Sequence, residues 1–155
     1  MAKKPAITMA NLFARYVEKP PDPLPPEMVA KDHYLTRAFF YDAGAAIFHV
    51  LTHNLRVNEI TPERWEAVNR EIALPDTRDA TREGTLQWWF ADALKDEPPE
   101  LRPHLEQCFY AGTLATLLVI TEGKLDVPRL SGMKTLGREL DAIQRVLKNE
   151  SRTVH

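Results

Sequence analysis

The hydrophobic positions of this chain follow a helical pattern, and two segments are apolar on nearly every side. Residues 38–51 read AFFYDAGAAIFHVL, interrupted only by Asp42 and His49, and residues 108–121 read CFYAGTLATLLVIT with no charged side chain. A helix that is hydrophobic all round is buried in the core instead of lying at the surface. The two segments therefore predict a central pair of buried helices, and the glycine and alanine in both indicate that the helices cross closely.

Shorter amphipathic helices are predicted around this pair, with prolines concentrated in the connections between them. Proline stops a helix and is tolerated in its first turn. Thr61-Pro62 is such a start signal, because threonine caps the first backbone N–H groups and proline fits the first helical position. No segment alternates in the manner of a strand. The expected helices cover residues 9–18, 32–54 (or from 27), 62–73, 81–95, 103–122 and 131–149, with a short helical turn at 126–128.

These elements predict an all-α fold, a compact bundle of five or six helices around the central buried helix pair. Residues 20–26 hold five prolines in seven positions and should be extended, close to polyproline II. We therefore divide the chain into an N-terminal helical arm on a proline-rich strap, residues 1–26, and a single helical domain, residues 27–155. The arm either folds back on its own domain or reaches to another copy.

Composition adds the broad class of the protein. With 44% hydrophobic and 27% charged residues, the chain is of the globular and not the disordered type. Neither apolar segment has the roughly 20 residues that span a membrane, and the N-terminal residues lack the continuous apolar stretch of a signal peptide. One cysteine, Cys108, excludes an internal disulfide and fits a reducing compartment. We expect a cytoplasmic protein that does not contact membranes.

The formal net charge of −2 is unevenly distributed along the chain. Residues 59–107 carry six Lys and Arg against twelve Asp and Glu, whereas residues 124–155 carry seven against four. Such segregation suits association with another copy or with a polyanion, and a solvated surface with chance clustering would show it as well.

A polar stripe on the first apolar segment is the sharpest candidate for chemistry. Asp42, His49 and His53 are separated by seven and four residues, so they lie along one side of the predicted helix. Two histidines one helical turn apart can share a Zn or Fe ion, and the second central helix offers further ligands. The alternative is that no cofactor binds, that His49 makes one hydrogen bond in the core, and that His53 lies exposed at the helix end. The further ligands would be His104, Glu106 and Cys108.

Trp88 lies on the opposite side of its predicted helix from the apolar face. One interpretation is that another element covers it, and the proline rings of residues 20–26 would stack well on indole. The other is that Trp88 anchors a partner, because tryptophan is enriched at binding hot spots. We keep both interpretations. The apolar face of this helix comprises Leu86, Trp89, Phe90, Ala93 and Leu94.

The last predicted helix combines an apolar seam with a basic outer face. The seam repeats at spacings of three and four, which suits an edge helix packed on the bundle. The outer face contacts a partner protein, contacts nucleic-acid phosphates, or is simply solvated, and Asp141 interrupts its positive charge. The seam residues are Met133, Leu136, Leu140, Ile143 and Leu147, and the basic residues are Lys134, Arg138, Arg145, Lys148 and Arg152.

The leading functional hypothesis is a small non-enzymatic protein-interaction protein, such as an adaptor, an inhibitor or a subunit of a larger assembly. No catalytic constellation or cofactor-binding motif stands out in the sequence. The alternatives are a metal-dependent helical-bundle enzyme that uses Asp42, His49 and His53, and a nucleic-acid-associated subunit that uses the basic face. The expected partner-binding residues, for a second protein or another copy, are Trp88, Lys134, Arg138, Arg145 and Lys148.

Overall fold

The part of the chain that the structure describes consists of helices and the turns that connect them. The computed structural model describes residues 7–19, 24–53, 55–73 and 86–154, and these ranges contain six α-helices, one short 3₁₀ helix and no strand. The predicted all-α fold is therefore confirmed. The helices are α1 (Met9–Glu18), α2 (Pro26–Thr52), η1 (Val57–Glu59), α3 (Pro62–Ala73), α4 (Leu86–Leu94), α5 (Arg102–Ile120) and α6 (Leu130–Val154).

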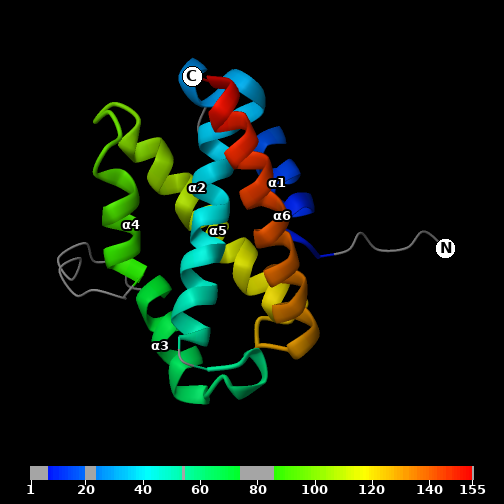
Figure 1. Cartoon of the computed structure of the whole chain (residues 1–155). Helices are drawn as coiled ribbons and strands as arrows, with labels where there is room; N and C mark the ends of the chain where they lie inside the picture. The colour runs from blue at the N-terminus through cyan, green and yellow to red at the C-terminus, as the bar shows by residue number, and fades with distance from the viewer. Residues whose placement is uncertain (1–6, 20–23, 54, 74–85, 155) are drawn as a thin grey trace.

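The bundle is built on the crossing of α2 and α5, as the two apolar segments predict (Figure 1). α1 and α6 lie on one side of this pair, and α4 lies on the other, with α3 below it in the view. The crossing is close because Gly112 of α5 has no side chain. A Cβ atom there would lie 2.9 Å from the Cβ of Ala43 and closer still to the carbonyl oxygen of Phe40. The small residues thus mark the point of contact.

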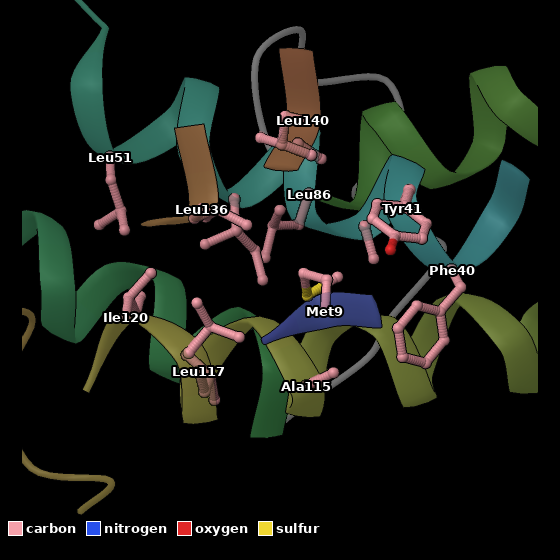
Figure 2. Packing of buried hydrophobic residues seen from close by; sticks show 14 of the residues in the cluster. Met9, Phe40, Tyr41, Leu51, Leu86, Ala115, Leu117, Ile120, Leu136 and Leu140 are labelled. Carbon is pink, nitrogen blue, oxygen red and sulfur yellow. The ribbon is translucent and has the colours of Figure 1, made fainter. Parts of the chain in front are cut away.

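Every α-helix contributes side chains to the core. Figure 2 shows Met9 of α1 at the centre of the cluster, between Leu136 of α6, Ala115 of α5 and Phe40 of α2. α5 is buried on nearly all sides, which explains its lack of an amphipathic pattern. The predicted seam of α6 also faces this core, with Met133 and Leu136 fully buried. The buried residues of α5 are Leu105, Cys108, Phe109, Gly112, Thr113, Ala115, Thr116, Leu117, Val119 and Ile120.

The N-terminal arm folds back on its own domain. The hydroxyl of Thr8 caps α1 by accepting from the N–H of Asn11 at 3.1 Å. The carboxylate of Glu139 on α6 accepts from the N–H groups of Met9 at 2.8 Å and Ala10 at 3.0 Å. A negative charge at this position also suits the positive end of the helix dipole. Glu139 therefore fixes the start of α1 against α6.

Several predicted boundaries change in the structure. α2 begins at Pro26, where proline supplies the backbone angle of the first helical position, so the earlier of the two expected starts is nearly right. α6 runs to Val154, five residues beyond the expected end. The short helical turn expected at 126–128 is wrong, because this segment is a non-helical turn. Residues 20–23 of the strap and the expected helix start at Thr81 lie outside the described residues.

The third helix matches the sequence prediction closely. α3 spans Pro62–Ala73, and the hydroxyl of Thr61 accepts from the N–H of Arg64 at 3.2 Å, which is the predicted cap. Within the described ranges, no helix combines the length and the apolar character that a membrane span needs.

Candidate interaction surface

The turn between α5 and α6 has an unusual and tightly bonded backbone. Three of its residues have positive φ angles: Glu122 at 54°, Gly123 at 84° and Leu125 at 54°. The N–H of Gly123 donates to the carbonyl of Leu118 at 2.7 Å, which closes the C-terminus of α5. The N–H of Leu125 donates to the hydroxyl of Thr121 at 2.9 Å. These bonds hold the backbone of Leu125 in a conformation that residues other than glycine rarely adopt.

An ion pair locks the second half of the same turn. Two nitrogens of the Arg129 guanidinium donate to the two carboxylate oxygens of Asp126 at 2.8 and 3.0 Å. This pairing, aided by a backbone N–H bond, lowers the pKa of Asp126 to about 2. The N–H of Arg129 donates to the carbonyl of Ile120 at 2.7 Å, and the indole of Trp65 on α3 donates to the carbonyl of Asp126 at 2.9 Å. The turn is thus tied to both α5 and α3.

Three large apolar side chains project from this turn into solvent. Leu125 is 59% exposed, Val127 is 55% exposed, and Leu130, the first residue of α6, is 47% exposed. We call Leu125, Val127 and Leu130 the tip patch. Single exposed apolar residues are common on protein surfaces, but these three lie within six positions of one braced turn.

Two hollows flank the turn. One has a volume of about 190 Å³ and lies where η1 meets the start of α6. The other is wider, about 520 Å³, and lies where α3 meets the turn. Together with the tip patch they give this end of the bundle an uneven surface. The first hollow is lined by Asn58, Ile60, Pro128, Arg129, Leu130 and Met133, and the second by Trp65, Glu66, Asn69, Arg70 and Asp126.

The predicted basic face of α6 is exposed and continues from the tip patch. Its described members, Lys134, Arg138, Arg145 and Lys148, are all exposed, and none of them forms an ion pair with any described residue. We call these four residues the basic strip. Leu130 lies one helical turn before Lys134, so it stands at the start of the same face. The side chain of Arg152 lies outside the described part of the chain.

Trp88 lies on a different part of the molecule. It is half-buried on α4, and its ring meets that of Trp89 edge-on at a centroid distance of 5.4 Å. Figure 1 places α4 across α2 from α6, so the structure does not bring Trp88 together with the basic strip. Residues 20–23 lie outside the described ranges, and the covering of Trp88 by the strap stays a prediction.

The polar stripe of α2 faces solvent instead of the core. Asp42, His49 and His53 are all exposed, so the expected core hydrogen bond of His49 is wrong, whereas the exposed position of His53 at the helix end is confirmed. The two imidazole rings lie 5.4 Å apart, and His49 also meets Trp89 edge-on at 5.3 Å. In the part of the chain that is described, no three His, Cys, Asp or Glu side chains converge as metal ligands.

Asp42 differs from the other exposed carboxylates in its hydration. Neighbouring protein atoms remove part of the water around its carboxyl group and raise its pKa from 3.8 to about 6, although the residue as a whole stays exposed.

The additional ligands considered on α5 lie in different surroundings. Cys108 is fully buried in a second small core with Met28, Phe39, Leu101 and Leu105. Its sulfur lies 3.6 Å from the hydroxyl of Tyr16. Burial raises the pKa of the Cys108 thiol, which favours the unreactive protonated form. His104 and Glu106 are half-buried.

The tip patch is the feature that sequence reasoning missed. A signal was present, because apolar residues stand between Gly123 and Pro128 without the spacing of a helix or a strand. The positive φ angle of Leu125 and the indole bond of Trp65 depend on tertiary structure and have no local sequence pattern.

Comparison with known proteins assigns the chain to no family. It matches no protein-family model, no curated protein and no solved structure. The function is therefore argued from the surface itself.

Proposed function

We propose that this protein is a small non-enzymatic interaction protein, an adaptor, inhibitor or assembly subunit, that binds a protein partner through the end of the bundle formed by the α5–α6 turn. The observation that carries the proposal is the exposure of more than half of Leu125 and Val127 on a turn that is held by several hydrogen bonds. Apolar surface in water costs about 25 cal/mol per Å². A partner that covers the tip patch recovers this free energy.

The bracing of the turn supports binding rather than chance exposure. The left-handed conformation of Leu125 costs about 1–2 kcal/mol in itself. A flexible loop would relax and turn its leucine toward the protein, but the Thr121 hydroxyl and the Asp126–Arg129 pair oppose this movement. A surface that is ordered before binding loses less conformational entropy on association. The local strain is therefore accounted for if the turn presents its side chains to a partner.

The polar groups of the turn support a structural role instead of a chemical one. Asp126 and Arg129 neutralise each other and bond to the backbone, and the low pKa of Asp126 keeps it ionised at neutral pH. A general acid or base needs a pKa near the working pH. These two residues shape the surface that a partner meets.

The proposal is tested by site-specific photo-crosslinking in the organism that encodes the chain. A benzophenone amino acid at position 127 should give one discrete adduct with another protein. The control position is Glu100, which is exposed and precedes α5, at the opposite end of a helix about 28 Å long. Discrete adducts at Val127 and none at Glu100 support the proposal. The same diffuse pattern at both positions, or no adduct at Val127, would contradict it.

A benzophenone amino acid at position 88 tests the second contact that the sequence suggests, the one through Trp88. An adduct with the same partner would extend the interaction surface to α4. A partner that is captured at Val127 alone would restrict it to the tip patch and the elements beside it.

A further inference from the structure

We infer that the partner contributes an acidic protein segment with a large apolar side chain at one end, which docks on the tip patch and along the basic strip of α6. The inference rests on the proposed function and specifies the chemistry of its partner.

The proposed docking surface changes in character along the axis of α6. Leu130 and the hollow beside it stand at the start of α6, and Lys134, Arg138, Arg145 and Lys148 follow on the same face. From Leu130 to Lys148 the helix rises about 27 Å. One end of the surface therefore carries an exposed leucine beside a hollow, and the remainder carries exposed cations.

The hollow at the apolar end suits an anchoring side chain. Its volume of about 190 Å³ is lined by polar and apolar residues together, and Ile60, Pro128 and Met133 supply apolar surface. A few large side chains that fill such pockets, often aromatic, supply most of the free energy in many interfaces. The partner's apolar residue is placed here.

The basic strip selects the charge of the partner. Its four cations have no ion-pair partner among the described residues, and Asp141 is the only exposed acid between Leu130 and Lys148. Complementary charge speeds encounter and excludes partners of the wrong sign. An acidic segment that follows the strip would pair with groups that are already in place.

The same features favour a protein segment over a nucleic acid. A duplex presents phosphates along its whole length, and no part of it would fill the hollow at one end of this surface. No aromatic side chain is interleaved with the strip to stack on unpaired bases, and the molecule carries a net charge of −2. A second copy offers acidic residues too, and the sedimentation experiment below distinguishes it from a separate protein segment.

The test is selection of random 18-residue peptides displayed on phage against the full chain. Selected peptides should be rich in Asp and Glu and carry Leu, Phe or Trp near one end.

Binding of the synthetic peptide should fall about tenfold in the Lys134→Glu/Arg138→Glu variant. Val127→Ser should weaken it as well. The control is Lys95→Glu/Arg102→Glu, which reverses two exposed cations elsewhere and should bind as the unchanged protein does, although Lys95 pairs with Asp92 and Arg102 donates to the carbonyl of Glu97. Circular dichroism confirms that each variant is folded.

Four results would overturn the inference. Selected peptides that are neutral or basic, or that bind the Lys134/Arg138 variant normally, would show that the strip does not choose the partner. Salt-sensitive binding to a 20-base-pair duplex that this variant loses would assign the strip to nucleic acid. Concentration-dependent self-association in sedimentation, also lost in the variant, would assign it to a second copy. Failure to enrich peptides would reject the acidic segment, and the proposed function would fail with it only if Val127 also captured no protein.

Discussion

Single residues in this protein take roles that their surroundings decide. Asp42 and His49 interrupt an apolar segment, yet both residues are exposed in the folded protein. Leu125 is apolar and exposed, and its backbone is held in the left-handed region. The sequence identifies Asp42 and His49 as unusual because they interrupt an apolar segment, but it does not single out Leu125. The direction in which each side chain points follows from tertiary contacts.

Replacing Asp42 with asparagine should reveal the cost of its charge. The folded pKa of about 6 lies above the unfolded value of 3.8, so ionisation destabilises the native state as the pH rises from 3.8 through 6. Asp42→Asn should therefore be more stable than the unchanged protein at pH 8, by no more than about 1 kcal/mol because the side chain keeps contact with water. The difference should shrink toward pH 4. Urea unfolding at several pH values measures it, and a difference that is independent of pH would contradict the assignment.

At the scale of elements, the sequence predicts helices better than it predicts how they are fixed together. Thr61-Pro62 marks the start of α3 because capping is a local interaction. The bond from Glu139 to the start of α1 joins residues 130 positions apart, and the Trp65 bond to the turn spans 61 positions. No spacing in the sequence reports such contacts. The crossing of α2 and α5 is an exception, since the small residues in both apolar segments indicate it.

Glu139→Ala should loosen α1 selectively. The substitution removes the acceptor of two backbone N–H groups, at Met9 and Ala10, and should cost about 1–2 kcal/mol. Amide hydrogen exchange should rise across Met9–Glu18 more than in α5. In Glu139→Gln, which retains one acceptor oxygen, the exchange of α1 should lie between that of the unchanged protein and that of Glu139→Ala. An equal rise in exchange throughout the bundle would show that Glu139 acts on the whole fold and not on the arm.

Two glycines on the bundle helices should respond to alanine in opposite ways. Gly112→Ala brings a methyl group against the backbone of Phe40 and should cost about 1–3 kcal/mol or more. Gly137→Ala places its methyl 3.6 Å from the ring of Phe48, an ordinary contact, and should stabilise α6 by about 0.5–1 kcal/mol. Thermal or urea unfolding of both variants tests the crossing. Similar effects of the two substitutions would be inconsistent with the close approach of α2 and α5.

At the scale of the whole molecule, the residues that form the core differ from those proposed to contact a partner. The α2–α5 pair and the seam of α6 form the core, and the outer face of α6 and the α5–α6 turn remain available at the surface. The basic strip was predictable because its spacing is that of one helix face. The tip patch was not, because it depends on three positive φ angles and on an ion pair within the turn. The two features become one surface only in the folded protein.

Amide hydrogen exchange in the α5–α6 turn of the free protein tests the central claim, that this surface is preformed. The N–H groups of Leu125 and Arg129 donate to Thr121 and Ile120, so they should exchange at least roughly tenfold more slowly than in an unstructured chain. Thr121→Val, which removes the hydroxyl acceptor, should abolish this protection at Leu125 and leave it at Arg129. Exchange of both amides at the unstructured rate in the unchanged protein would contradict the claim, because the turn would then be free to withdraw its apolar side chains from solvent.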